Sequence, residues 1–181
     1  ASRIAYGVMQ QRLLLDYYIS QYCTARTRKL EPRVLDILRI SAYQLMFMER
    51  VPPSAAVNDR FALCRGGGCV RAAGMVNAVL RRIAENRDAL PPIRAASRTE
   101  ELSIKYSTPP ELTLLFEREL GGDAEALLRA QNEPAPITMQ VNTCRTDTKS
   151  LLASLERDGV RAREHDYLPD CVVCGSAGGI E

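Results

Sequence analysis

The sequence predicts a mainly α-helical protein that ends in a smaller mixed α/β segment. Apolar side chains recur at helical spacing through most of residues 4–131, in segments that prolines and glycines separate. From residue 137 the pattern changes, because residues 137–141 alternate apolar and polar side chains as a half-buried strand does. The 181 residues, of which 46% are hydrophobic and 25% charged, suit one ordinary domain followed by a smaller one.

Three long helices are predicted in the first half of the chain, over residues 4–22, 34–48 and 70–86. The second is apolar on most sides, which is typical of a central, buried helix. Pro32 suits its first turn, where the missing N–H costs nothing. Asn77 lies on the apolar stripe of the third helix, so we expect it to be buried and hydrogen-bonded to a backbone turn.

A shorter helix is expected between the second and third of these. Pro52 and Pro53 end the preceding helix, and Ser54 suits the N-cap because its hydroxyl can accept a backbone N–H. The glycines at 66–68 end the short helix. They lead into the N-terminus of the next helix, where free N–H groups favour anions, so a phosphate contact and a solvated loop are both open interpretations.

The remaining elements are shorter. Residues 87–98 contain two prolines and little periodicity, which predicts a linker. Further helices are expected at 100–106, 109–120, 123–131 and 147–158, the last with Thr146 as its cap, and strands at 137–141, 160–164 and 171–174. These elements predict a helical domain over residues 1–90, a linker over 91–99, a helical connector over 100–133 and a β-α-β segment over 134–181.

Charge divides the chain into two unlike halves. Residues 1–98 contain 16 Lys and Arg against 7 Asp and Glu, a net charge of +9, whereas residues 99–181 contain 8 against 15, a net charge of −7. A basic half of this kind suits a polyanion partner. An imbalance that serves only solubility is the alternative. Apolar runs are too short for a membrane span, so no membrane association is expected.

The sequence offers no residue set for metal binding or catalysis. Cys171 and Cys174 have the spacing of a metal or redox pair, but no second pair exists and a poor helix start follows them. We expect a short strand there, with the two thiols on opposite faces. One histidine, His165, leaves little for acid–base chemistry. No catalytic, cofactor-binding or metal-binding residue is therefore assigned, and the six cysteines are expected to be reduced thiols.

Several segments resemble a known family in the order in which they occur. The sequences LDILRISAYQLMFM (35–48), VPPSAAV (51–57) and AAGMVNAVLRR (72–82) are similar to the second half of a NusB-like RNA-binding domain. The sequences LSIKYS (102–107) and NEPAPITMQVN (132–142) resemble the segment that joins such a domain to the catalytic domain of bacterial small-subunit ribosomal RNA cytosine-C5 methyltransferases, the RsmB, Sun or Fmu type. The resemblance covers nearly the whole chain.

This resemblance implies a NusB-like helical bundle, without its first helices, in a parent enzyme that transfers methyl from S-adenosylmethionine to a cytosine of ribosomal RNA. Helical patterning begins within a few residues of Ala1, so we expect the natural start to lie upstream. In the family, catalytic cysteines lie in Pro-Cys and Thr-Cys motifs on a Rossmann-like domain. The pair Thr143-Cys144 precedes that region, so Cys144 is expected to be structural. The chain would then be an RNA-recognition module without cofactor.

Basic residues around the last long helix are the candidates for RNA contact. Arg71 and Arg82 are 11 positions apart, about 20° on an α-helix, and are therefore expected to share a face. Surface arginines that merely offset the helix dipole are the alternative. The seven candidates are Arg26, Arg28, Lys29, Arg65, Arg71, Arg81 and Arg82.

The expected partner is small-subunit ribosomal RNA in the cytoplasm, and no DNA is expected. Few aromatic residues are candidates for base stacking, so sequence-specific recognition by this chain is expected to be weak. These candidates are Tyr22, Tyr43 and Tyr106. A transcription antitermination module of the NusB kind, without enzymatic activity, is the alternative function. A purely structural helical adaptor is a third.

Overall fold

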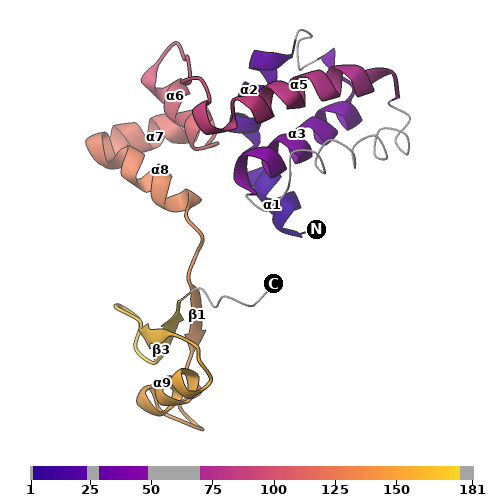
Figure 1. The fold of residues 1–181 in the computed structure, drawn as a ribbon. Coiled ribbons are helices and arrows are strands. Elements are labelled where there is room, and N and C mark those ends of the chain that lie inside the picture. The colour runs from indigo at the N-terminus through magenta and orange to yellow at the C-terminus, as the bar shows by residue number, and fades with distance from the viewer. Residues whose placement is uncertain (1, 24–28, 49–69, 176–181) are drawn as a thin grey trace. The chain divides into compact units, whose positions relative to one another are not determined.

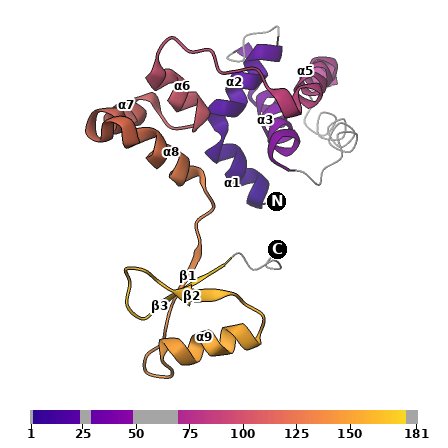
Figure 2. The same ribbon diagram turned by 60° about the vertical axis from the view of Figure 1, so that its left-hand side comes forward.

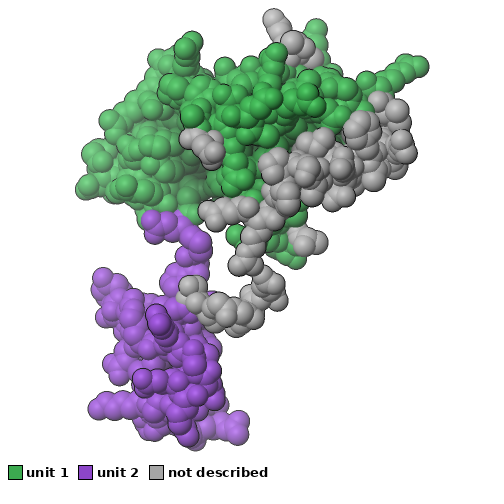
Figure 3. Space-filling view, viewed as in Figure 1, with its two compact units in different colours: residues 1–132 green, residues 133–181 purple. Residues whose placement is uncertain are grey.

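The computed structural model describes residues 2–23, 29–48 and 70–175 (Figure 1). They belong to two compact units, which Figure 3 distinguishes: a helical unit, residues 1–132, and a sheet unit, residues 133–181. The first consists of helices and the second contains a three-stranded sheet. The predicted mainly α fold with a small β-containing segment is confirmed. The finer domain boundaries within residues 1–133 remain predictions.

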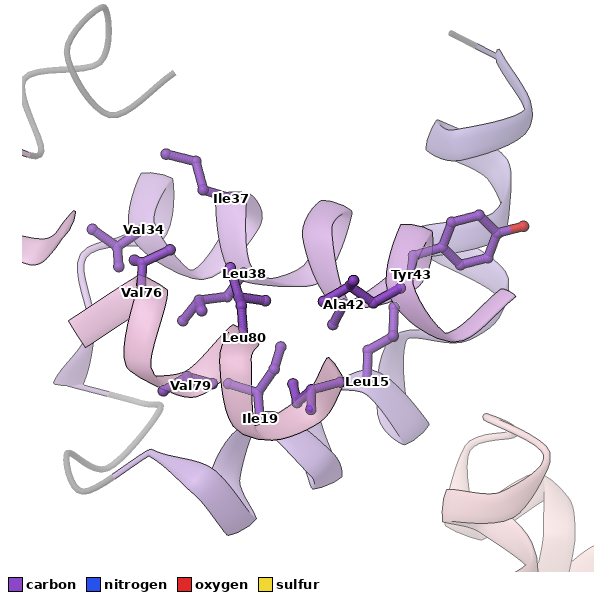
Figure 4. Packing of buried hydrophobic residues seen from close by; sticks show 12 residues of the cluster. Leu15, Ile19, Val34, Ile37, Leu38, Ala42, Tyr43, Val76, Val79 and Leu80 are labelled. Carbon is purple, nitrogen blue, oxygen red and sulfur yellow. The ribbon is translucent and has the colours of Figure 1, made fainter. Parts of the chain in front are cut away.

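One core of buried side chains holds the first helices together. α3 contacts the other helices of this group and is the central, buried helix that its composition predicts. Full burial of one Leu or Ile side chain stabilises a fold by about 1.5–3 kcal/mol. The helices are α1 (Ser2–Gln10), α2 (Arg12–Tyr22), α3 (Pro32–Phe47) and α5 (Ala73–Glu85). The core residues, most of them labelled in Figure 4, are Leu15, Ile19, Val34, Ile37, Leu38, Ala42, Tyr43, Leu45, Val76, Val79, Leu80 and Ile83.

The single helix predicted over residues 4–22 is wrong, because the helix breaks at Gln11 between α1 and α2. A tertiary contact stabilises the new helix start. The backbone N–H of Leu14, in the first turn of α2, donates to the Ser107 hydroxyl at 3.1 Å. Ser107 therefore caps α2 from a distant part of the chain. Ser107 itself has a positive φ of 51°.

The helix predicted over residues 70–86 also starts differently. Residues Val70–Ala72 form a 3-10 turn, and the α-helix begins only at Ala73. Asn77 is half-buried, so the prediction of full burial is wrong. The short helix predicted after Ser54 and the glycine turn at 66–68 lie outside the described residues.

α1 packs closely on α3 because Gly7 has no side chain. Gly7 is buried, and a methyl group added there would overlap the end of the Tyr43 ring. That ring is only 9% exposed and stacks on Phe47 with centroids 5.2 Å apart, so it has little room to move. Gly7 therefore sets the distance between the two helices.

An ion pair joins α2 to α3 at the edge of this core. Arg39 Nε and Nη2 each lie 2.7 Å from a different oxygen of Asp16, a bidentate arrangement. The side chains are 19% and 29% exposed. These hydrogen bonds raise the pKa of Arg39 above its ordinary value. Asp36 adds a weaker contact at 3.3 Å.

The chain after α5, at Pro91 and Arg94, is hydrogen-bonded to α2. A short turn at Arg87–Ala89 leads into extended chain. The Tyr18 hydroxyl donates to the carbonyl of Pro91 at 3.1 Å, and the backbone N–H of Arg94 donates to the Tyr17 oxygen at 2.7 Å. The residues predicted as a linker are thus tied to the helical core.

Three further helices complete the helical unit: α6 (Arg98–Lys105), α7 (Pro110–Leu120) and α8 (Ala124–Asn132), with a 3-10 turn at Gly121–Asp123. The Ser97 hydroxyl is the N-cap of α6 and accepts the Glu100 N–H at 3.1 Å. The Glu100 carboxylate accepts the N–H of Ala96, the residue before the cap. At the end of α8, Gln11 donates to the Asn132 side-chain oxygen at 2.9 Å. This bond ties α8 to the α1–α2 junction.

Glu125 links α6 to α8 through several polar contacts. Its Oε1 accepts from Lys105 Nζ at 2.7 Å and from the Tyr106 hydroxyl at 3.0 Å. Arg98 lies 3.6 Å from the other oxygen. The bond from Lys105, and then that from Tyr106, lowers the pKa of Glu125 below its ordinary value.

The sheet unit is a split β-α-β arrangement with an added central strand (Figure 2). β3 (Cys171–Cys174) lies between β1 (Ile137–Gln140) and β2 (Ala162–Glu164) and is antiparallel to both. β1 and β2 therefore run in the same direction, and α9 (Thr148–Arg157) connects them. α9 packs on β2 and β3, and Val172 at the centre is fully buried.

The cap of α9 differs from the prediction. Asp147, not Thr146, is the N-cap, and its carboxylate accepts the Ser150 N–H at 2.9 Å. A carboxylate also suits the positive end of the helix dipole. This backbone hydrogen bond lowers the pKa of Asp147.

Replacement of Gly7 by alanine is expected to destabilise the helical unit by about 1–3 kcal/mol, because the new methyl group must displace the Tyr43 ring. Gly74→Ala is the matched control. Among the described residues, apart from the backbone of α5 itself and the two chain neighbours, no atom lies within 4 Å of a methyl group added there, and alanine favours a helix. Urea unfolding followed by circular dichroism measures both. Equal stability of the two variants would contradict the close approach of α1 to α3.

Glu125→Gln is expected to lower the free energy of unfolding at neutral pH by less than about 1 kcal/mol, since the contacts are partly exposed. The folded pKa is lowered, so the stabilisation is present above the unfolded pKa and is lost as pH falls through the folded pKa. The difference from wild type should therefore disappear in acid. A difference from wild type that stays the same in acid would contradict this role of the Glu125 carboxylate.

Candidate RNA-binding surface

Four of the seven predicted RNA-binding residues lie in the described part of the chain, and all four are exposed. Lys29 precedes α3, Arg71 lies on the 3-10 turn before α5, and Arg81 and Arg82 lie on α5 itself. The other three, Arg26, Arg28 and Arg65, lie outside the described residues. Arg81 and Arg82 are consecutive residues of α5, and the role of the four as one surface remains a prediction.

The fold of α5 explains why Arg81 and Arg82 point to solvent. Leu80 and Ile83, on either side of this pair in sequence, are fully buried against α2 and α3. Successive residues are about 100° apart on an α-helix, so the two arginines fall on the outer half of the helix. Arg82 lies in the last turn, where a cation also offsets the helix dipole. This electrostatic effect is compatible with phosphate binding.

Arg71 needs a different geometry from the one predicted. The shared face with Arg82 was derived for a continuous α-helix, whereas Arg71 lies on a 3-10 turn of about three residues per turn. The angle of about 20° therefore does not apply to this pair. Arg71 is still exposed, one turn before the start of α5.

No carboxylate of the described residues pairs with these four cations. Within the residues that the structure describes, Lys29, Arg71, Arg81 and Arg82 form no ion pair. Arg39 is different, because both oxygens of Asp16 hold its guanidinium. The exposed cations can accept an external anion without first breaking a contact of the fold, whereas Arg39 cannot.

The tyrosines singled out for base stacking are not the exposed ones. Tyr43 is buried, and Tyr22 and Tyr106 are half-buried. Tyr6 on α1 is 72% exposed and Tyr167 in the β2–β3 connection is 88% exposed. The sequence carried a signal for Tyr6, because it lies about 200° around the helix from Ile4, on the side opposite the apolar stripe.

No catalytic centre is evident among the described residues. Within residues 2–23, 29–48 and 70–175, no three His, Cys, Asp or Glu side chains gather as metal ligands. His165 Nδ1 accepts the backbone N–H groups of Tyr167 and Leu168, both at 3.1 Å, which is a structural role. Cys171 and Cys174 lie on a short strand, as predicted, and both are free thiols. Cys144 lies in a turn, and its thiol is free and exposed. The backbone N–H of Cys144 donates to the side-chain oxygen of Asn142.

Comparison with protein families accounts for both ends of the chain. Residues 1–85 match the NusB family, and residues 112–181 match the Methyltr_RsmF/B-like, ferredoxin-like domain. The chain joins a NusB domain to an RsmF/B-type ferredoxin-like domain. The second match includes α7 and α8, which belong to the helical unit, and the sheet unit has the strand order of a split β-α-β fold. The predicted resemblance is confirmed.

Curated relatives resemble nearly the whole chain. The "Probable ribosomal RNA small subunit methyltransferase B" of Bacillus subtilis is 28% identical over 94% of this chain, which covers 38% of that protein. The "Ribosomal RNA small subunit methyltransferase B" of Vibrio cholerae is 29% identical over 93% of this chain, again 38% of that protein. The chain thus spans little more than a third of the length of these relatives.

A solved structure shares the fold. The crystal structure of the protein PH0851 superposes with a TM-score of 0.68 over 98% of this chain and 40% of that chain, at 20% sequence identity. In the described part of the chain no helix combines the length and apolar character that crossing a membrane requires.

Proposed function

We propose that the NusB domain of this chain binds small-subunit ribosomal RNA and serves as a recognition element of a ribosomal RNA cytosine-C5 methyltransferase. The observation that carries this proposal is the order of the two matched domains, NusB then RsmF/B-type ferredoxin-like. Relatives named as ribosomal RNA small subunit methyltransferases match this chain over more than nine tenths of its length. A NusB module that acts in antitermination alone does not account for the second domain.

The charge distribution supports RNA as the partner. The net charge of +9 over residues 1–98 lies in the half that contains the NusB domain. The arginines of α5 are exposed and unpaired among the described residues, so they can contact phosphates at little cost to the fold. We assign phosphate contacts to Lys29, Arg71, Arg81 and Arg82, and by sequence alone to Arg26, Arg28 and Arg65.

For the whole protein we propose methyl transfer from S-adenosylmethionine to carbon 5 of a cytosine, in the cytoplasm. We assign no residue of this chain to the methyl donor or to the covalent chemistry. The chain's contribution would be to hold the RNA so that the target base reaches the catalytic residues. Neither DNA nor a membrane is proposed as a partner.

For binding of the chain to a small-subunit ribosomal RNA segment, the logarithm of the association constant is expected to fall linearly with the logarithm of the salt concentration. Each neutralised phosphate contributes about 0.7–0.9 to the slope, so the seven assigned cations predict a slope of about −5 to −6. Filter binding over a salt series measures it. An affinity that does not change with salt would contradict phosphate contacts by the NusB domain.

The double variant Arg71→Glu/Arg82→Glu is expected to weaken this RNA binding about tenfold or more and to reduce the salt slope by about 1.5, because two phosphate contacts are lost. Both side chains are exposed, so the fold should survive. Arg118→Glu is the matched control, because Arg118 is an exposed arginine of the acidic half that pairs with Glu119. Equal affinity of the double variant and this control would remove the α5 surface from the binding site.

A further inference from the structure

The turn that connects β2 to β3 is organised around the one histidine of the chain, His165. Its Nδ1 accepts the backbone N–H groups of Tyr167 and Leu168, both at 3.1 Å. The Tyr167 ring lies edge-on to the imidazole, with the ring centroids 6.2 Å apart. A single ring nitrogen thus fixes the two residues in the middle of the turn.

Both ends of the turn are fixed by backbone hydrogen bonds that do not involve the imidazole. The His165 N–H donates to the Cys171 carbonyl at 2.9 Å, and the Asp170 carbonyl accepts the Val141 N–H at 2.7 Å. Asp170 has a φ of 52°, in the left-handed region that an aspartate tolerates. A change at the imidazole therefore affects residues 166–169 and leaves the ends of the three strands in place.

The two bonds to Nδ1 require a neutral ring. A ring nitrogen that accepts an N–H carries no proton, so the hydrogen-bond pattern assigns the proton of neutral His165 to Nε2. In an imidazolium both ring nitrogens are donors. When Nδ1 takes up a proton from the solvent, it becomes a donor that faces two N–H groups. Both bonds are then lost, and the N–H groups of Tyr167 and Leu168 must donate to water or to another acceptor.

The charged groups near His165 come from the turn and from the elements packed around it. β1 and β3 contain no charged residue, and α9 packs on β2 and β3. The three carboxylates of β2 and the turn face a single cation there, which is paired with Asp166 at 2.7 Å. Negative charge of this kind stabilises an imidazolium, so each protonation state of His165 has its own stabilising contacts. The charged groups are Arg163, Glu164, Asp166 and Asp170 on β2 and the turn, Arg145 after β1, and Lys149, Glu156 and Arg157 on α9.

We propose that the β2–β3 connection is a pH-sensitive turn, in which neutral His165 holds Tyr167 and Leu168 in place and the protonated ring releases them. Histidine is the side chain whose ordinary change of charge falls between about pH 5 and 8. The turn is therefore closed above this range and open below it. The inference concerns the sheet unit and does not depend on the proposed RNA binding.

The test follows the full chain, labelled with ¹⁵N, through a pH titration by NMR. The amide resonances of Tyr167 and Leu168 should shift between about pH 5 and 8, with the same midpoint as the imidazole nitrogens of His165. Protection of these amides against hydrogen exchange, relative to an unstructured peptide at each pH, should fall about tenfold as the ring is protonated, because each amide loses its hydrogen bond. At the upper end of the range, Nδ1 should have the chemical shift of an unprotonated nitrogen.

His165→Asn is the matched control variant, because an asparagine side-chain oxygen accepts backbone N–H groups in turns of this kind and does not titrate. In this variant the amides of Tyr167 and Leu168 should keep their protection throughout the titration. The Ser150 N–H is the internal reference, since its acceptor is the Asp147 carboxylate, whose pKa is lowered by that bond. The Ser150 amide should not respond between about pH 5 and 8.

Two outcomes would overturn the inference. In the first, the His165 ring titrates while the Tyr167 and Leu168 amides keep their resonance positions and their protection, which would mean that the imidazole does not hold the turn. In the second, His165→Asn loses protection at the same pH as wild type, which would mean that another group causes the change. Neither outcome concerns RNA affinity, so the proposed function is tested separately by its salt series.

Discussion

The helical unit depends on α2, which packs against the core on one side and bonds to the chain after α5 on another. Leu15 and Ile19 have no exposed surface and pack with α3 and α5. The neighbouring Tyr17 and Tyr18 hydroxyls bond to the extended chain at Arg94 and Pro91, and the Leu14 N–H bonds to Ser107. One helix of 11 residues thus fixes the core and also the path of the chain toward α6. For this reason α6, α7 and α8 belong to the same compact unit as α1, α2, α3 and α5.

The Asp16–Arg39 pair affects the surface charge of the NusB domain as well as the packing of α2 on α3. A half-buried bidentate pair of this kind is costly to break, because removal of one partner leaves a partly buried charge. It also withdraws the only carboxylate of α1 and α2 from the surface. Among the described residues, Arg12 of α2 and the two arginines of α5 form no ion pair. The basic character of the NusB domain thus depends partly on where its few carboxylates are used.

Sequence periodicity predicted most elements because it reports which side of a helix or strand is buried. α3 is apolar on most sides and is indeed central, and the strand at Cys171 follows from its β-branched neighbours and the glycines after it. The break at Gln11 was not predictable in this way. The apolar stripe continues through it, and the Ser107 hydroxyl that caps the new helix comes from a residue 93 positions away. Likewise the placement of β3 between β1 and β2 follows from pairing, which local pattern does not encode.

The candidate surface was predictable in its charges but not in its aromatic residues. Exposed arginines follow from helical phase, since Arg81 and Arg82 flank buried positions of α5. Tyr43 looked available because it is polar at one end, yet its ring fills the space that Gly7 leaves, a contact between two different helices. Tyr6 is exposed for the complementary reason, because Gly7 turns the opposite side of α1 toward the core. Gly7 therefore allows the Tyr43 ring to be buried between α1 and α3.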